Sequence, residues 1–499
     1  MAFLFSILTS SPLNVVLPTL VVFFSLIFIY NALQSLFHHF ISDGKYSNCS
    51  SYGPEKHLLI GSLIPFYKNR RRLLGWYTKL LAESPTGTIV VDRLGARRTI
   101  ITANPENPFT DILGDLLGCG IFNVDGEAWH VRRKLASHEF STKSLRDFVV
   151  KALKSEVHDR LLPILSSSEK KKKVVDMQDL LRRLAFDNIC KITMGTDPGF
   201  LDESMPVSEL ASAFDVAAEI SASRGMAPVS AVWKAKRAFG VGSEKRLKVA
   251  VELIHGSIME IIKEKRKGME MKLVHNDLLS RLIQGGQSNE VIRDMVISFI
   301  MAGKDTTSSA LTWFFWLLSC NPNVEKEVVR EVMQAKEVIG YQELKEMKFL
   351  EASLCESMRL YPPVVWDSKH AAGDDQMPDG TRVGGGDRVT YFPYGMGRME
   401  KLWGEDRNEF KPCRWLVGDR REVAPVSPYK FSVFQAGPRV CLGREMAFVQ
   451  MKYVAAALLR RFKLRRVDKE LPVLVPLLTS HMAGGLNMVV EKRVDLLRN

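Results

Sequence analysis

One cysteine near the C-terminus, Cys441, constrains the fold of this chain more than any other feature. It lies in the stretch FQAGPRVCLG, residues 434–443, and the apolar run REMAFVQMKYVAAALL follows at once. That run predicts a helix starting just after the cysteine, and the N–H groups at a helix N-terminus stabilise the thiolate form that binds metals. Gly437 permits backbone angles closed to other residues, Gly443 lets a flat partner approach the main chain, and Arg439 offers paired donors for a carboxylate. The stretch predicts a site for a flat, metal-bearing ligand that carries carboxylates.

A flat, metal-bearing ligand with carboxylates is a haem. The stretch resembles the F-x-x-G-x-R-x-C-x-G signature of the cytochrome P-450 family, at Phe434, Gly437, Arg439, Cys441 and Gly443. The resemblance implies that Cys441 is the axial thiolate ligand of the iron in haem b, and that the other four residues contact this cofactor. The alternative is a buried cysteine at a helix start, but five fixed positions are rarely met by chance.

Length and composition exclude several other classes of protein. The chain has 499 residues, of which 46% are hydrophobic, and this allows a large buried core. Its seven cysteines are odd in number and form no C-x-x-C pair, which argues against a disulfide framework and a structural zinc site. The net charge of +13 favours acidic partners. The basic residues are scattered, however, so we expect no nucleic-acid partner.

The N-terminus predicts a membrane anchor. Residues 1–42 contain no Asp, Glu, Lys or Arg, and residues 13–33 would span about 30 Å as a helix, close to one hydrocarbon core. The criteria for a cleaved signal peptide, the rival interpretation, are poorly met. We expect residues 1–12 to be lumenal, 34–56 to form a hinge and 57–499 to form the catalytic domain. Positive charge lies only downstream of the anchor, which places that domain in the cytosol. The resemblance implies the endoplasmic reticulum membrane.

The rest of the chain predicts a mainly α fold with small β-sheets, and the resemblance implies the cytochrome P-450 fold. GTIVVDRLG and RRTIITA predict two strands with a turn at Gly95. Residues 125–320 have a mostly helical pattern, with loops expected at 166–173 and 195–206. Helices continue over 321–361, residues 362–421 are rich in loops and strands, and LNMVVEK predicts a strand near the C-terminus.

Two stretches upstream of Cys441 resemble structural elements of the family. ESMR sets Glu356 and Arg359 three residues apart on one helix face, where they can pair. FKPCRW contains Arg414, which resembles the third member of the ion network formed by the E-x-x-R and P-x-R-F elements. Arg414 is followed by Trp415 rather than the commoner Phe. The alternative for Glu356 and Arg359 is an exposed helical salt bridge.

The stretch AGKDTT, residues 302–307, puts polar groups in the middle of a long apolar helix. In the family this helix crosses the distal face of the haem. The resemblance implies that Gly303 lets oxygen lie close to the backbone, that Thr306 donates a hydrogen bond to bound dioxygen, and that Asp305 feeds a proton relay. The alternative is hydroxyl back-bonding that bends the helix, which would explain Thr307 alone.

The stretch WHVRR sets Trp129 and Arg133 four residues apart on one helix face. It resembles the W-x-x-x-R element that binds a haem propionate. The alternative is that both are ordinary packing and surface residues.

The family resemblance implies an NADPH- and oxygen-dependent monooxygenase that receives electrons from NADPH-cytochrome P-450 reductase. Candidate contacts for this acidic partner are Arg132, Lys134, Arg444 and Lys452. A haem-thiolate isomerase or dehydratase acting on hydroperoxides is an alternative. Such enzymes typically lack the acid–alcohol pair that Asp305 and Thr306 provide here.

Several stretches, including RLYPPVVWDSKHAA and PLLTSHMAGGL, resemble plant fatty-acid and jasmonate hydroxylases of family ninety-four, most of all its B subfamily. The resemblance implies 12-hydroxylation of jasmonoyl-isoleucine, a lipid-like carboxylate, with ω-hydroxylation of medium- and long-chain fatty acids as the alternative. An apolar pocket with one anion-binding end would suit either substrate. Candidate lining residues are Phe109, Leu113, Leu117, Ile121, Phe122, Ile300, Ala302, Val364, Val365 and Trp366. Arg97, Arg98 and Arg224 are candidates for the carboxylate.

The stretch ITANPENPFTDILGD departs from the family pattern. Relatives place the B helix between the second strand and PFTDILGD, whereas two prolines, Pro105 and Pro108, leave no room for a helix near residues 104–108. A third hypothesis follows, in which the missing helix makes the chain a non-catalytic, membrane-bound haem protein.

Overall fold

The computed structural model describes residues 52–57, 60–84, 88–91, 99–102, 112–140, 143–202, 208–227, 230–271, 277–336, 338–418 and 422–493. The expected anchor at 13–33, the lumenal segment, most of the hinge and the shortened stretch at 104–108 lie outside these residues. Within the described part of the chain, no helix combines the length and the apolar character needed to cross a membrane. The chain divides into two compact units: residues 1–108, 227–238 and 368–391 form unit 1, and the remainder forms unit 2.

Unit 1 is built on a four-stranded sheet with the strand order β1-β2-β7-β4. β1 (Thr88–Val91) and β2 (Thr99–Thr102) are antiparallel, whereas β2 and β7 (Arg388–Tyr391) are parallel. The two strands predicted from GTIVVDRLG and RRTIITA are therefore confirmed, and the turn at Gly95 lies outside the described residues. The other elements of the unit are α3 (Leu63–Asn69), α4 (Leu73–Glu83), α11 (Ser230–Phe239), β4 (Asp367–His370), β5 (Asp375–Gln376) and β6 (Arg382–Val383).

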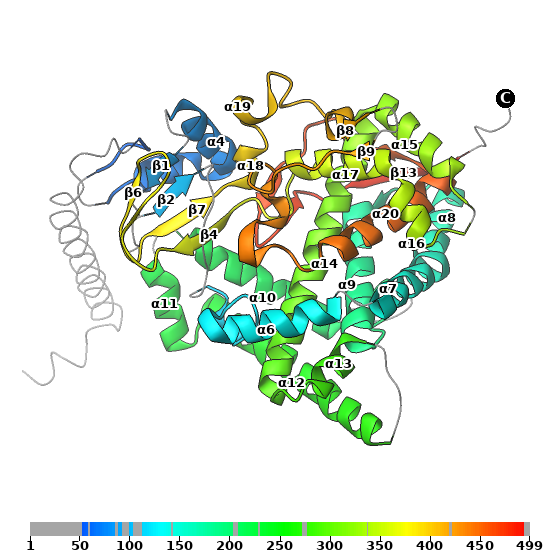
Figure 1. Cartoon of the computed structure of the whole chain (residues 1–499), viewed down its shortest axis with the longest axis horizontal. Helices are drawn as coiled ribbons and strands as arrows, with labels where there is room; N and C mark the ends of the chain where they lie inside the picture. Colours follow the sequence, from blue (N-terminus) through cyan, green and yellow to red (C-terminus); the bar gives the residue numbers. More distant parts are fainter. Residues whose placement is uncertain are drawn as a thin grey trace, which may run out of the picture. The chain divides into compact units, whose positions relative to one another are not determined.

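Unit 2 is mainly helical, which confirms the predicted mainly α fold class, and Figure 1 shows long helices such as α12 and α14. The α-helices of the unit are α5 (Gly114–Leu117), α6 (Gly126–Phe140), α7 (Lys143–Ser155), α8 (Leu162–Lys170), α9 (Met177–Met194), α10 (Glu209–Met226), α12 (Gly242–Glu270), α13 (Leu278–Gln284), α14 (Asn289–Cys320), α15 (Pro322–Gln334), α16 (Tyr341–Glu346), α17 (Lys348–Leu360), α18 (Pro393–Met396), α19 (Glu400–Trp403) and α20 (Arg444–Arg461). Short strands complete the unit: β3 (Val175–Asp176), β8 (Leu416–Val417), β9 (Glu422–Val423), β10 (Phe462–Arg466), β11 (Leu474–Pro476), β12 (Ser480–Met482) and β13 (Asn487–Lys492).

The predicted loop at 166–173 is wrong for its first five residues, because α8 continues to Lys170. Leu162, Leu165 and Ser168 are buried along one face of this helix, and the Ser168 hydroxyl donates to the Ile164 carbonyl. Packing of that face against the core therefore overrides the low helical preference of three consecutive serines.

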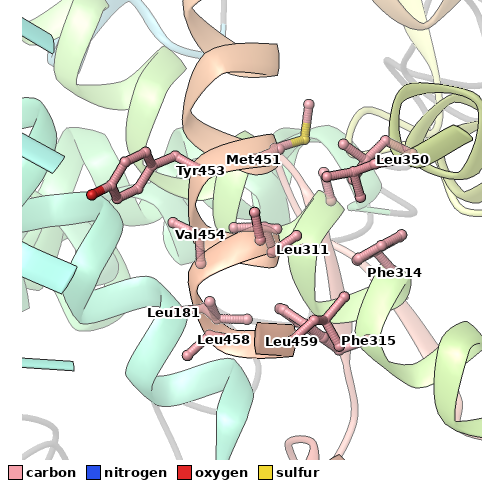
Figure 2. Packing of buried hydrophobic residues seen from close by; sticks show 14 of the residues in the cluster. Leu181, Leu311, Phe314, Phe315, Leu350, Met451, Tyr453, Val454, Leu458 and Leu459 are labelled. Carbon is pink, nitrogen blue, oxygen red and sulfur yellow. The ribbon is translucent and has the colours of Figure 1, made fainter. Parts of the chain in front are cut away.

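The core of unit 2 forms where α20 meets α14, α17 and α9, as Figure 2 shows. Leu311 and Phe314 of α14, Leu350 of α17 and Leu458 of α20 are almost fully buried there. Each such side chain contributes about 1.5–3 kcal/mol to folding through removal of apolar surface from water. This packing fixes the start of α20, and hence the position of the residues just before it.

The central turns of α14 are less buried than the turns on either side. Met301, Ala302, Gly303 and Thr306 are half-buried, whereas residues 294–300 and 307–318 are buried throughout. Ala302 and Thr306 are four residues apart and therefore lie on the same face of the helix. Protein atoms do not fully cover α14 at this face.

Candidate active site

Cys441 lies three residues before α20, in a loop held by main-chain hydrogen bonds. Its N–H donates to the Phe434 carbonyl at 2.8 Å. Gly437 has a φ of +67°, a value that L side chains rarely adopt, and this explains why glycine stands there. The helix after the cysteine is present as predicted, with Gly443 as its N-cap residue.

Two opposing influences act on the Cys441 thiol. Burial raises the pKa of the thiol, whereas the Gly443 and Arg444 N–H groups and the charges of Arg133 and Arg444 lower it. The side chain is nevertheless accessible to solvent. The Cys441 sulfur is surrounded by protein atoms on most sides but borders a space that protein atoms do not fill, and solvent reaches it there. A negatively charged sulfur in that position would gain from the N–H groups and the cations around it.

Gln435 is a residue of this loop that no sequence motif singles out. Its φ of +62° and ψ of −179° lie in a region that essentially only glycine occupies. Its side-chain Nε2 donates to Asp367 Oδ2 at 2.6 Å. Such a backbone conformation costs about 1–3 kcal/mol and persists only where the surroundings impose it. The Asp367 hydrogen bond is one part of what holds the loop in this form.

The structure brings Trp129, Arg133 and Arg439 together beside the cysteine. The Arg439 guanidinium lies 4.8 Å from the centre of the Trp129 ring, and it donates to Asp125 and to the Val124 carbonyl. The pKa of Arg133 is lowered by burial first, while the nearby Cys441 raises it and Arg439 lowers it further. Within the described residues, Arg133 has no hydrogen bond or ion pair. A half-buried cation without a protein partner therefore stands next to the thiol.

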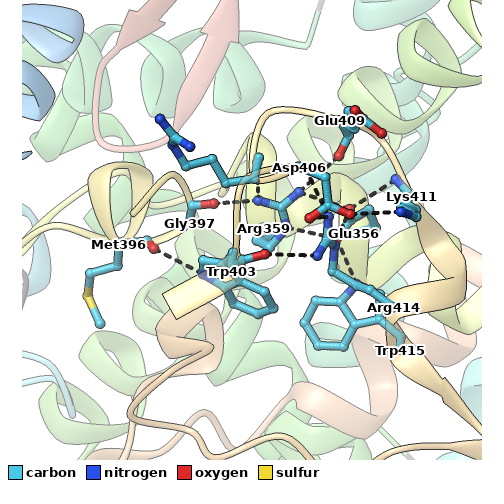
Figure 3. Close-up of polar contacts among 11 residues, drawn as sticks. Glu356, Arg359, Met396, Gly397, Trp403, Asp406, Glu409, Lys411, Arg414 and Trp415 are labelled. Carbon is cyan, nitrogen blue, oxygen red and sulfur yellow. Dashed lines mark hydrogen bonds and ion pairs between the residues drawn. The ribbon is translucent and has the colours of Figure 1, made fainter. Parts of the chain in front are cut away.

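Glu356, Arg359 and Arg414 form one buried network, which Figure 3 shows. Arg359 donates to both Glu356 oxygens, at 2.7 and 2.8 Å, and to the carbonyls of Gly397, Arg407 and Glu409. Arg414 Nε donates to Glu356 Oε1 at 2.9 Å. The side chains of Glu356 and Arg359 are both 0% exposed, so the alternative of an exposed helical salt bridge is wrong.

Trp415 replaces the commoner Phe of the family pattern, and the structure gives the substitution a role. Its Nε1 donates to Glu356 Oε2 at 2.8 Å, and its ring packs against Phe431 at 4.7 Å between centroids. A phenylalanine could make the ring contact but not the hydrogen bond. Glu356 thereby gains one more donor than the usual pattern supplies.

Asp305 and Thr306 lie in the less buried turns of α14. Thr306 Oγ1 donates to the Ala302 carbonyl at 2.5 Å, so the back-bonding predicted as an alternative for Thr307 occurs at Thr306. Asp305 Oδ1 lies 3.2 Å from Lys304 Nζ, and no hydrogen bond reaches it from the described residues. Lys304 is buried and also pairs with Asp215 of α10. A carboxylate that is only partly satisfied therefore adjoins the open face of α14.

Gly303 has a packing role that the sequence did not predict. A Cβ on this residue would lie 2.5 Å from Ile189 Cδ1 of α9. Any larger residue would therefore force the Ile189 side chain to shift, because real Cβ atoms do not approach other atoms so closely. Glycine here lets the Ile189 side chain pack directly against α14.

The candidate lining residues fall into three groups. Leu113, Leu117, Ile121 and Ile300 belong to one apolar cluster of unit 2. Val365 is buried, Val364 and Ala302 are half-buried, and Trp366 lies 6.2 Å from Phe392 between ring centroids. Phe122 is 48% exposed, and Phe109 lies outside the described residues.

Two expectations for basic residues need correction. Lys452 is buried and donates to the Leu344 carbonyl and to Glu351, so its proposed role as a surface contact for a reductase is wrong. Arg224 is paired with Glu244 and Asp115, which argues against it as the binder of a substrate carboxylate. Lys134 and Arg444 are exposed, Arg132 is half-buried, and Arg97 and Arg98 lie outside the described residues.

Comparison with known proteins gives this chain a family. The Cytochrome P450 family model matches residues 88–481. The chain belongs to the cytochrome P450 family, and it is a monooxygenase. It is 54% identical to Cytochrome P450 94B1 of Arabidopsis thaliana over 90% of this chain and 93% of that protein. Cytochrome P450 94B3 of Arabidopsis thaliana is 53% identical over 92% and 95%, and Cytochrome P450 94A1 of Vicia sativa 45% identical over 88% and 90%.

Membership of this family implies a haem-thiolate cofactor, and the residues around Cys441 fit one. The thiol borders a space, the Arg133 cation beside it has no partner among the residues that the structure describes, and the turns of α14 around Ala302 and Thr306 are incompletely covered. The described residues contain no group of three or more His, Cys, Asp or Glu side chains arranged to hold a metal ion. A single thiolate with nearby cations suits an iron held mainly by a macrocycle whose propionates are anionic.

Proposed function

We propose that this chain hydroxylates an acidic lipid at or near its terminal carbon, with jasmonoyl-isoleucine 12-hydroxylation as the preferred reaction. The observation that carries this proposal is the similarity to the B subfamily members over nine-tenths of the chain. The second candidate is ω-hydroxylation of medium- and long-chain fatty acids. The resemblance of several stretches to the fatty-acid hydroxylases of family ninety-four keeps that candidate open.

Cys441 would hold the haem iron through its sulfur in this proposal. Arg133, Trp129 and Arg439 would bind the propionates, and Phe434, Gly437 and Gly443 would shape the loop against the macrocycle. The chemistry that a thiolate-ligated haem supplies is reductive activation of dioxygen with electrons from NADPH. Burial outweighs the Gly443 and Arg444 N–H groups and leaves the pKa of the Cys441 thiol above its ordinary value. The thiol would therefore lose its proton only on binding the iron, while these N–H groups would stabilise the resulting thiolate.

Asp305 and Thr306 would manage protons at the open face of α14. Thr306 Oγ1 donates to the Ala302 carbonyl, so it can reach the exposed face only by rotating away from that carbonyl. Asp305 is buried, and its Oδ1 lies 3.2 Å from Lys304 Nζ. We propose that Asp305 accepts and passes on a proton, and that Thr306 Oγ1 donates it towards the reacting atoms.

The apolar cluster that contains Leu113, Leu117, Ile121 and Ile300 would receive the hydrocarbon part of the substrate. Ala302 and Thr306 on the neighbouring turns of α14 would then lie close to the reacting carbon. We propose that the remaining candidates line the same substrate pocket. They are Phe109, Phe122, Val364, Val365 and Trp366.

We also propose the environment that the family generally uses. A flavoprotein reductase would deliver the electrons, with exposed Lys134 and Arg444 among the contacts for its acidic surface. The chain would be anchored in the endoplasmic reticulum membrane by residues 13–33, with the catalytic domain in the cytosol.

The test is an assay with reductase and NADPH that offers jasmonoyl-isoleucine and lauric acid side by side. We expect the larger kcat/KM for 12-hydroxylation of jasmonoyl-isoleucine. The reverse preference would move the assignment to the fatty acids. Turnover of a hydroperoxide without NADPH would favour the isomerase or dehydratase hypothesis. A chain that binds haem but converts neither lipid would favour the non-catalytic one, and adding back a B helix near residues 104–108 would then restore activity.

Replacement of Thr306 tests proton delivery separately from substrate choice. Thr306→Ala should lower product formed per NADPH consumed, because the hydroxyl that donates the proton is absent. Thr307→Ala, one residue away and buried, is the matched control and should keep the wild-type ratio. Equal coupling in the Thr306→Ala and wild-type proteins would rule out this role.

A further inference from the structure

Residues 112–123, here named the 112–123 segment, carry four of the proposed lining residues and only one short helix, α5. Side chains from three other helices, α10, α12 and α14, bond to this segment. Such contacts matter because a segment with little secondary structure of its own keeps its position only through partners outside it.

Arg224 of α10 makes the first attachment. Its Nη1 donates to Asp115 Oδ2 at 2.8 Å and to the Ile112 carbonyl at 3.2 Å. The same guanidinium is fixed from the other side by Glu244 of α12, whose two oxygens accept from Nε and Nη2. The side chains of Arg224 and Glu244 are each 2% exposed. A planar guanidinium held on both sides cannot move without breaking charged, buried hydrogen bonds.

Asp294 of α14 makes the second attachment. Its Oδ2 accepts from the Cys119 N–H at 2.8 Å, and its Oδ1 accepts from Arg293 Nε at 2.8 Å. The neighbouring residues of the segment are Gly118 and Gly120. A Cβ on Gly118 would collide with the Asp294 carboxylate, and a Cβ on Gly120 would collide with the Ser298 hydroxyl. The two glycines thus let the segment lie directly on α14.

His255 of α12 makes a third and weaker attachment, with Nε2 3.4 Å from the Leu116 carbonyl. Burial lowers the pKa of His255, and nearby Arg293 lowers it further. The ring is therefore neutral near pH 7, and the contact is an ordinary hydrogen bond if Nε2 carries the proton. Its length makes it the least important of the three.

We propose that Arg224 and Asp294 are positioning residues that fix the 112–123 segment against the helices, and thereby select which carbon of the lipid chain is hydroxylated. The selection of a carbon rests on the proposed function, whereas the attachment of the segment does not. A hydrocarbon chain has no polar group near its end, so the walls of its pocket set how far it enters. A displacement of about 1 Å at the reacting atom can change a rate a hundredfold.

The test uses the full-length, haem-loaded protein and two variants that act on different attachments. Asp294→Ala removes the acceptor for the Cys119 N–H, and Asp115→Asn removes the charge that Arg224 contacts while leaving the buried Glu244 pair intact. Glu252→Ala is the matched control, because Glu252 of α12 is an exposed carboxylate that lies 3.9 Å from Lys248. Hydrogen exchange over residues 112–123 and the ratio of terminal to adjacent hydroxylation are measured for each protein.

We expect Asp294→Ala to speed exchange of the Cys119 amide by about tenfold, since a charged hydrogen bond is lost. Both variants should shift product from the terminal carbon to its neighbour and raise KM more than they lower kcat. Glu252→Ala should match the wild type in every measurement. Unchanged exchange in both variants, or faster exchange with an unchanged product ratio, overturns the proposal.

Failure of the proposed function gives a different pattern. If the wild-type protein hydroxylates neither jasmonoyl-isoleucine nor lauric acid, the assigned reaction is wrong and so is the selection of a carbon. The exchange measurement needs no substrate, and it still decides whether Asp294 holds the 112–123 segment.

Discussion

The Glu356 network and the Cys441 loop are both rich in polar groups, but the protein satisfies them to very different degrees. Around Glu356, the carboxylate and the Arg359 guanidinium have protein partners on all sides and are fully buried. Around Cys441, the thiol borders open space, Arg133 has no partner among the described residues, and Gln435 adopts a strained backbone. The polar groups around Glu356 bond to other protein groups and stabilise the fold. The groups around Cys441 lack such partners, and this indicates a site for a ligand.

The largest expected effect comes from Cys441→Ser. The reduced protein with carbon monoxide should lose the thiolate-type Soret band entirely, because a serine hydroxyl is not a thiolate. The fold should remain, since the side chain is accessible and fills no core position. Circular dichroism checks the fold. Cys413→Ser, at another exposed cysteine, should keep the band. A thiolate band in Cys441→Ser would show that the ligand is another residue.

Glu356→Gln should give the next largest effect, which is a loss of folding stability. The change removes the carboxylate that faces the fully buried Arg359, while Arg414 keeps its pair with Asp406. Loss of this buried charge should lower the free energy of unfolding by about 3–5 kcal/mol. Denaturant unfolding measures this loss. The control is Glu327→Gln on α15, where Glu327 lies 2.6 Å from the exposed Arg330 and the pair contributes about 0–1 kcal/mol. Equal losses of unfolding free energy in the two variants would mean that the buried network stabilises the protein no more than an exposed ion pair does.

Arg133→Gln should weaken cofactor retention while leaving the apoprotein intact. The unpaired guanidinium would otherwise bond to a propionate, so its loss should speed haem release by about tenfold. Transfer of haem to excess apomyoglobin measures the rate. Lys134→Gln alters an exposed cation on the same helix and should release haem at the wild-type rate. Identical rates in the two variants would remove Arg133 from the proposed propionate site.

Trp415→Phe should have the smallest effect, a loss of about 1 kcal/mol, because one hydrogen bond to Glu356 disappears while the ring packing stays. A double-mutant cycle with Glu356→Gln sharpens the measurement. The two changes should combine to less than their sum, since Glu356→Gln replaces the charged acceptor of the Trp415 hydrogen bond with a weaker, neutral one. Strict additivity would show that the Trp415 hydrogen bond adds nothing to the network.

Much of the site could be predicted because each motif is a local pattern with a local reason. The helix after Cys441, the glycine at position 437 with its positive φ, and the pairing distance of Glu356 and Arg359 all follow from neighbouring residues. The two strands of unit 1 follow from the same kind of pattern. The sequence-based predictions failed where packing against residues distant in the sequence decides whether a side chain is exposed. Nothing near Lys452 in the sequence indicates that Glu351 and the Leu344 carbonyl will receive its ammonium group inside the protein.

The sequence by itself determined which residue types stand in the family's motifs, and therefore the class of chemistry. Tertiary structure alone decided that Trp415 serves Glu356, that Gly303 makes room for Ile189, and that Arg224 holds the 112–123 segment rather than standing free. The physical reason is the same in each case. The partner lies 59 residues or more away along the chain, so only the packed fold fixes which groups meet and which remain open for a ligand.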